Sequence, residues 1–190
     1  MGMIRTFIAV TIPADIQRQI AELQAKLKAA GGKVSWPRSE NIHLTLKFLG
    51  DTDNRRLNEI ARGLAQAAAT VSPFELKIGS VGAFPNLKYP RVIWVGAVSE
   101  GNQLQLLVHN IEEQMSALGF EKERRPYSAH LTLGRVKDVR GIQTTLEKLQ
   151  QFEKFEGGSF EVDAIHLIKS ELHPAGSIYT LLRTIELKRS

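Results

Sequence analysis

The tetrapeptide His-Leu-Thr-Leu occurs twice in this chain, at residues 43–46 and again at residues 130–133. Histidine has an ordinary pKa of about 6.5, so one imidazole can start neutral and another protonated at physiological pH. A neutral imidazole can take a proton from an attacking water while an imidazolium gives one to a leaving oxygen. Threonine hydroxyls can hold the non-bridging oxygens of a phosphate between the two rings. Two such motifs brought together would suit in-line displacement at phosphorus, which needs an acid and a base on opposite sides.

The repeat is too long to be a chance match in a chain with only five histidines, given ordinary residue frequencies. The other three histidines have weaker claims to a catalytic role. His109 lies beside an apolar helical stripe and is expected to be exposed, His166 lies in a strand and is expected to be structural, and His173 belongs to a turn. The candidate catalytic residues are therefore His43 and His130.

Strand alternation separates each motif into two faces. Successive side chains of a β-strand point to opposite sides, so His43 and Thr45 share one face while the two leucines of that motif share the other. The second motif repeats the arrangement with His130 and Thr132. We therefore expect the leucines to anchor each strand in a core and the two threonines to bind a phosphate.

The residues that follow each motif are candidate phosphate ligands with different prospects. Lys47 shares the predicted face of His43 and would bring a positive charge to the phosphate. Arg135 points away from His130 by the same alternation, unless a β-bulge or a strand end redirects it. Lys47 is therefore preferred over Arg135 as a substrate-binding residue, although a guanidinium group can donate two parallel hydrogen bonds to a phosphate.

The apolar periodicity predicts an order of elements that repeats once along the chain. The repeated unit is strand, helix, His-Leu-Thr-Leu strand, helix and strand, which predicts an α+β protein. We expect residues 1–190 to form a single domain of two similar lobes, each carrying one motif (43–46 and 130–133). Strands are expected at 5–12, 41–50, 74–84, 91–98, 129–136, 160–170 and 178–187, and helices at 13–30, 57–69, 104–118 and 144–152.

The composition limits the class of protein. A chain of 190 residues with 43% hydrophobic and 24% charged residues is typical of a globular protein with its own core. It has no cysteine, which excludes disulfides, thiolate metal sites and a cysteine nucleophile. It also lacks His-x-His, HExxH and GxxxxGK[ST] sequences, so no metal or other cofactor is expected. The net charge of +5 favours anionic partners such as RNA, and no apolar stretch approaches the length of a membrane span.

These features together resemble the 2H phosphoesterases, and in particular the RNA 2',3'-cyclic phosphodiesterase group, which is also known as the 2'-5' RNA ligase family. Each similar segment is a weak match alone, but their order and spacing make the resemblance specific. One departure is Ala129, which stands where proline often precedes the second histidine. The segments are RTFIAVTIP, WPRSENIHLTLKFLGD, VGAFPNLKYPRVIWVG, RPYSAHLTLGRVK and IHLIKSELHPAGSIYTLL.

The resemblance implies a bilobal, pseudo-twofold α+β fold in which two antiparallel sheets line a central cleft and the helices lie outside. It implies hydrolysis of RNA 2',3'-cyclic phosphate ends to 2'-phosphates without a metal or cofactor. His43 would be the proton donor and His130 the proton acceptor, with Thr45 and Thr132 holding the phosphate. We expect a cytoplasmic monomer that acts on RNA and does not contact membranes.

Three alternatives stay open at this point. The same site would also serve 2'-5' ligation of RNA halves or hydrolysis of a small cyclic nucleotide, and the chain could be a non-catalytic RNA-binding module. The presence of both histidines and both threonines argues against the last of these. The residue types do not decide which histidine is the acid, because each exchanges its role in the reverse reaction.

Overall fold

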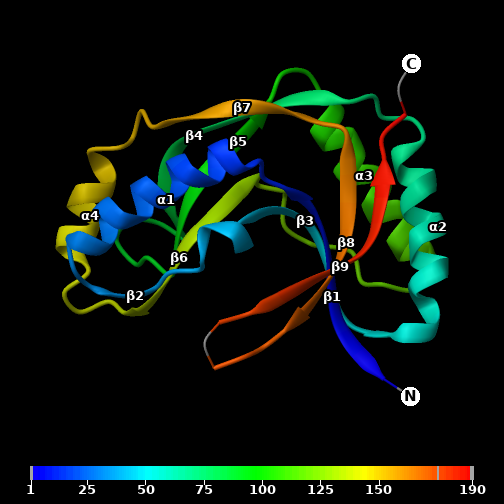
Figure 1. Cartoon of the computed structure of the whole chain (residues 1–190), viewed down its shortest axis with the longest axis horizontal. Coiled ribbons are helices and arrows are strands. Elements are labelled where there is room, and N and C mark those ends of the chain that lie inside the picture. Colours follow the sequence, from blue (N-terminus) through cyan, green and yellow to red (C-terminus); the bar gives the residue numbers. More distant parts are fainter. Residues whose placement is uncertain (1, 175, 189–190) are drawn as a thin grey trace.

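One continuous antiparallel β-sheet forms the centre of the computed structural model, which describes residues 2–174 and 176–188 (Figure 1). Its nine strands lie in the order β7-β4-β5-β6-β3-β1-β8-β9, with β2 paired to β6. The strands are β1 (Met3–Thr11), β2 (Lys33–Ser35), β3 (His43–Asp53), β4 (Phe74–Phe84), β5 (Val92–Ser99), β6 (His130–Asp138), β7 (Glu156–Val162), β8 (Ala164–Glu171) and β9 (Ile178–Glu186). The α-helices are α1 (Ala14–Ala29), α2 (Leu57–Ala68), α3 (Gln103–Ala117) and α4 (Gln143–Gln150).

The sheet divides into two halves between β3 and β6, which are joined by one residue pair, Leu44 with Leu131. We call β3, β1, β8 and β9 the His43 half-sheet, and β6, β2, β5, β4 and β7 the His130 half-sheet. Helices α2 and α3 lie beside the first, and α1 and α4 lie together beside the second (Figure 1). The α+β class is confirmed, and the two predicted sheets are the two halves of one sheet.

Each half-sheet combines elements from both halves of the sequence. Strand β4 pairs with β5 and β7, and α1 contacts β7 and α4, so these early elements belong with the His130 half-sheet. Conversely, β8 pairs with β1, and α3 contacts α2 and β3. The two sequence repeats are therefore interleaved in space, which explains why no linker separates them.

The apolar residues of the motifs and helices form the core as predicted. The stripe expected for α1, which comprises Ile16, Ile20, Leu23 and Leu27, is buried. All four motif leucines are at most 4% exposed. Burial of each contributes about 1.5–3 kcal/mol, so the leucines hold each motif strand with its histidine on the opposite face.

Two stretches differ from the sequence prediction. Residues 33–35 form β2, a strand too short to show alternation. The strand predicted over 160–170 is two strands, β7 and β8, separated at Asp163, because the chain crosses there from one half-sheet to the other. The turn predicted to contain His173 is followed closely by Ala175, which lies outside the described residues.

A β-bulge follows the first motif and reverses the strand alternation. The register of β3 against β1 skips one residue between Thr45 and Lys47, and such an extra residue turns the following side chains to the other face. Lys47 is therefore 6% exposed on the core side, whereas Phe48 is 62% exposed on the face of His43. The prediction that Lys47 shares the face of His43 is wrong, because the alternation does not continue through the bulge.

The same irregularity follows the second motif. The register of β6 against β5 skips one residue between Thr132 and Gly134. A Cβ atom at Gly134 would lie 2.9 Å from Cε3 of Trp36, so glycine is required for this close packing. The next residue, Arg135, is exposed, and the bulge turns it to the face of His130. The sequence prediction placed Arg135 on the opposite face unless a bulge redirected it, and such a bulge is present.

A buried ion pair holds the first bulge against helix α3. Lys47 Nζ lies 2.7 Å from Glu112 Oε2 and 2.8 Å from the carbonyl oxygen of Glu121. The hydroxyl of Tyr127 donates to the carbonyl oxygen of Thr45 at 3.0 Å. These contacts satisfy polar groups at a point where the regular hydrogen-bond ladder is interrupted.

Replacing Lys47 with Met should lower the free energy of unfolding by about 1–3 kcal/mol, because the partly buried carboxylate of Glu112 would lose its partner. Adding Glu112→Leu to this variant should recover most of the loss, since apolar side chains replace a buried ion pair at little net cost. Urea denaturation gives both values. The matched control is Lys77→Met, which breaks an exposed pair with Glu100 and should leave the midpoint unchanged. Equal losses in the two single variants would contradict a structural role for the buried pair.

Candidate functional site

The two motifs meet at the centre of the sheet, where β3 and β6 lie next to each other. The leucine that follows each histidine pairs with its counterpart in antiparallel register, so His43 lies opposite Thr132, and Thr45 opposite His130. Diagonal neighbours in an antiparallel pair are about 7–8 Å apart, which is the separation expected between His43 and His130. The two strands therefore bring both histidines and both threonines to one surface.

Aromatic side chains enclose the ring of His43 on two sides. The Phe7 ring is stacked on it with centroids 4.6 Å apart, and the Tyr179 ring meets it edge-on at 5.2 Å. Nδ1 of His43 lies 2.8 Å from the carbonyl oxygen of Asn41. Asn41 is held in turn by its side-chain amide, which donates to the carbonyl oxygen of Ser177 at 3.0 Å. The β8–β9 connection thus supports the orientation of His43.

His130 has a similar environment in the other half-sheet. The Phe84 ring meets it edge-on with centroids 4.8 Å apart, and Phe84 itself packs on Trp94 at 5.2 Å. Nδ1 of His130 lies 2.7 Å from the carbonyl oxygen of Ser128. In both motifs the carbonyl that contacts the histidine therefore belongs to the residue two positions earlier.

The backbone fixes the same tautomer at both histidines. A carbonyl oxygen only accepts hydrogen bonds, so Nδ1 of each ring carries a proton and donates it. Nε2 is then the nitrogen of each ring that is left to accept or donate a proton during a reaction. Each ring therefore keeps one nitrogen that is free of the backbone and suited to general acid or base chemistry.

Burial lowers the pKa of His43, and the hydrogen bond to the Asn41 carbonyl opposes this with a smaller effect. The physical cause is desolvation, which disfavours the charged imidazolium. A bound phosphate would act in the opposite direction, because a nearby negative charge favours the protonated ring. Burial also raises the pKa of Tyr127, so this phenol keeps the proton that it donates to Thr45.

The predicted site residues fall into two groups. The histidines and threonines of both motifs lie on one face of the sheet, and Arg135 lies on the same face beyond the second motif. Lys47 does not belong to this group, because its ammonium is engaged with Glu112 on the core side. Within residues 2–174 and 176–188, no three His, Asp or Glu side chains are grouped so that they could hold a metal ion.

The aromatic residues that enclose the histidines are not among the predicted site residues. Phe7 comes from β1, Tyr179 from β9 and Phe84 from β4, so each is distant from its histidine in the sequence. Their proximity depends on strand pairing, which apolar periodicity does not reveal. The one local contact is with the residue two positions before each histidine, whose carbonyl oxygen accepts from Nδ1. Every residue has a carbonyl, so the residue types give no sign of this contact.

His166 has two side-chain contacts of its own, apart from the two motifs. Its ring nitrogens lie 3.2 Å from Oγ1 of Thr11 and 3.2 Å from Oγ1 of Thr184, and burial lowers its pKa. It lines a pocket of about 180 Å³ beside the end of β1. With both nitrogens engaged by threonine hydroxyls, His166 agrees with the structural role expected from the sequence.

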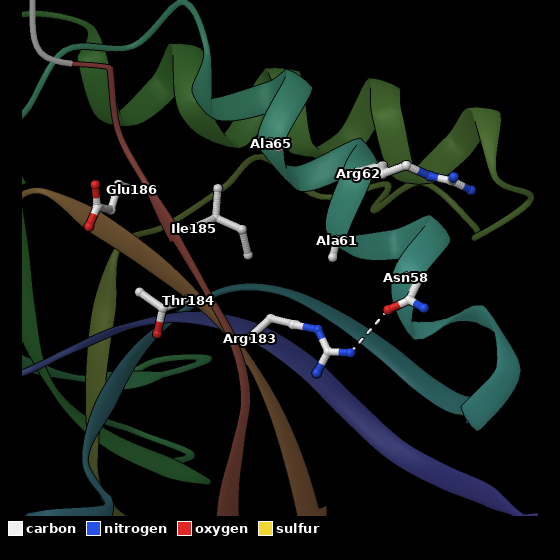
Figure 2. Close-up of a pocket in the computed structure, with 8 residues that line it drawn as sticks. All are labelled: Asn58, Ala61, Arg62, Ala65, Arg183, Thr184, Ile185 and Glu186. Carbon is white, nitrogen blue, oxygen red and sulfur yellow. Dashed lines mark hydrogen bonds between the residues drawn. The ribbon is translucent and has the colours of Figure 1, made fainter.

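A larger pocket, of about 620 Å³, lies between α2 and β9 (Figure 2). Arg183 points toward α2 there and donates from Nη2 to Oδ1 of Asn58 at 3.0 Å. No histidine lines this pocket, so the paired acid and base of the motifs are not found in it. Its other lining residues are Ala61, Arg62, Ala65, Thr184, Ile185 and Glu186.

None of the helices in the described part of the chain has the length and apolar character needed to span a bilayer.

Comparison with known proteins agrees with this geometry. The family model LigT like Phosphoesterase matches the chain twice, over residues 10–94 and 95–179, so each match contains one motif. The chain is 38% identical to the RNA 2',3'-cyclic phosphodiesterase of Methanocaldococcus jannaschii, over 94% of this chain and 98% of that protein. It is 35% identical to the protein of the same name from Methanothermobacter thermautotrophicus, over 97% of this chain and 99% of the relative.

Comparison with solved structures points to the same family. The crystal structure of E. coli LigT complexed with 3'-AMP has a TM-score of 0.77 to this chain at 27% identity, covering 99% of this chain and 100% of that one. The apo form of E. coli LigT has a TM-score of 0.76 at 26% identity and covers both chains completely. The double match of the family model, the full-length relatives and the shared fold confirm the resemblance, and the chain belongs to the LigT-like phosphoesterase family.

Proposed function

We propose that this protein hydrolyses the 2',3'-cyclic phosphate ends of RNA to 2'-phosphates, with His43 and His130 as acid and base and without a metal ion. The observation that carries the proposal is the junction of two His-x-Thr motifs in which each Nδ1 is bound to a backbone carbonyl. Relatives named as RNA 2',3'-cyclic phosphodiesterases support the choice of substrate.

The proposed reaction assigns one proton transfer to each histidine. Nε2 of His130 accepts a proton from water while the water oxygen bonds to phosphorus. The bond between phosphorus and O3' breaks, and Nε2 of His43 donates its proton to O3', which leaves a 3'-hydroxyl and a 2'-phosphate. Thr45 and Thr132 donate hydrogen bonds to the non-bridging oxygens, and Arg135 adds a positive charge. Proton exchange with water then restores both rings.

The donor role of His43 depends on the substrate. In the free protein burial lowers the pKa of His43, which by itself favours the neutral ring. A cyclic phosphate diester carries a negative charge, and its approach favours the imidazolium. Substrate binding therefore restores the protonation state that the donor role requires.

Substituting either catalytic histidine should abolish most of the turnover. With an oligonucleotide that ends in a 2',3'-cyclic phosphate, and with EDTA present, the natural protein should release a 2'-phosphate product. His43→Ala and His130→Ala should each lower kcat by about 10²–10⁴-fold, the usual contribution of a general acid or base. Chromatographic separation of the 2'-phosphate from the cyclic end measures both rates.

The control variant is His109→Ala, which removes an exposed histidine on α3 and should keep full activity. Undiminished turnover in both motif variants would refute the mechanism, and activity lost on chelation would refute metal independence. Salt-sensitive RNA binding without any product would indicate the non-catalytic module instead.

The pH profiles of kcat/KM and kcat should differ in a definite order. The protonated fraction of His43 falls as the pH rises through its pKa, and kcat/KM reports that pKa in the free enzyme, where burial lowers it. The parameter kcat reports the substrate complex, where the phosphate charge raises the pKa. The decline of kcat/KM at rising pH should therefore begin at a lower pH than the decline of kcat. The opposite order, measured by steady-state kinetics across the pH range, would contradict the donor role of His43.

A further inference from the structure

Positive charge gathers along the outer part of β6, beyond the paired motifs. Residues 33–38, 91–94 and 134–141 together contain six cationic side chains and one carboxylate, a net charge of +5. The whole chain has 25 cationic and 20 acidic residues, which is also +5, so the remainder of the chain is balanced. The six cations are Lys33, Arg38, Arg91, Arg135, Lys137 and Arg140.

Strand pairing brings the three segments together. Arg135 is the register partner of Ser35 in β2 and of Val92 at the start of β5. The backbone N–H of Val136 donates to the carbonyl oxygen of Arg91 at 2.9 Å. Strand β2 and this end of β6 lie side by side in Figure 1. The excess charge of the protein is therefore concentrated at one end of the His130 half-sheet.

Four of these cations have side chains that are available to a ligand, and one of them, Arg135, is already assigned to the cyclic phosphate itself. Arg38, Arg91 and Lys137 are exposed, and their side chains make no hydrogen bond or ion pair within the described part of the chain. The carboxylate of the cluster, Asp138, already binds two of the other cations. It therefore leaves the charge of these three side chains uncompensated.

We propose that Arg38, Arg91 and Lys137 form a track that binds the phosphates of the RNA chain leading to the cyclic end. Lys137 lies roughly 13 Å beyond Thr132 along β6, at about 3.3 Å per residue with one residue taken up by the bulge. These cations therefore lie beyond the motifs at the end of the His130 half-sheet, farther from Thr132 than a single nucleotide reaches. Cations that follow a nucleic-acid backbone strengthen binding through counterion release, whatever the sequence. The proposal rests on the proposed function and adds that the preferred substrate is an RNA chain rather than a mononucleotide.

Two triple variants with the same loss of charge test the track. The track variant removes its three cations, and the control variant removes three cations that are also exposed and lack ion pairs within the described residues. Each is assayed with a hexanucleotide that ends in a 2',3'-cyclic phosphate and with cytidine 2',3'-cyclic monophosphate. The track variant is Arg38→Gln, Arg91→Gln and Lys137→Gln, and the control variant is Arg18→Gln, Lys28→Gln and Lys154→Gln.

The track variant should show a KM for the hexanucleotide that is raised on the order of tenfold at low salt. The slope of log KM against log salt should become shallower by about 2, because each phosphate of a single strand that a cation neutralises adds about 0.7 to that slope. Its kcat and KM for the mononucleotide should stay unchanged, because that substrate ends before the track. The control variant should match the natural protein on both substrates.

Equal increases in KM in the two triple variants would overturn the track, because net charge alone would then explain them. It would also be overturned if the natural protein showed no preference for the hexanucleotide. Fluorescence anisotropy with a hexanucleotide that cannot react separates this proposal from the proposed function. A protein that turns over neither substrate, but loses RNA affinity only in the track variant, would refute the function and support the track.

Discussion

The residue pair between Leu44 and Leu131 is the constraint on which the rest of the site depends. It is the place where the two half-sheets join, and its antiparallel sense sets each histidine opposite the threonine of the other motif. A shift of one residue would turn every side chain of a motif to the other face of the sheet. The buried leucines prevent such a shift, so the apolar half of the tetrapeptide determines where its polar half points.

The two halves of the site are alike in their histidines and differ in what surrounds them. Each ring is held by a carbonyl two residues earlier, and each motif is followed by a bulge. The first bulge is held by the ion pair of Lys47, whereas the second has Gly134 and a bond from the Gln24 side chain to the Leu133 carbonyl. After the bulges, the His43 half-sheet exposes the ring of Phe48 and the His130 half-sheet exposes Arg135. The chemistry of the two histidines is therefore nearly symmetric, while the charge around them lies on one side.

The sequence was sufficient to predict the motif strands, the four α-helices and the four polar side chains at the junction of the motifs. These features follow from the spacing of apolar residues along the sequence, which is a local property of the chain. The positions of Lys47 and Arg135 depend on a bulge, which is a mismatch between two strands and leaves no mark in either strand alone. The interleaving of the two repeats, and the aromatic rings of Phe7 and Phe84 beside the histidines, also arise from pairing between distant segments. The sequence was therefore enough to identify the side chains that meet at the junction of β3 and β6, but not the contacts that orient them.

The claim that the two motifs are halves of one phosphate site is tested most directly by a crystal structure of the protein with phosphate bound. We expect one anion between the motifs, with Nε2 of His43 and Nε2 of His130 each about 2.7–3.2 Å from its oxygens. An anion that contacts one histidine alone would contradict the claim. So would an anion bound between Arg62 and Arg183, with none at the junction of β3 and β6.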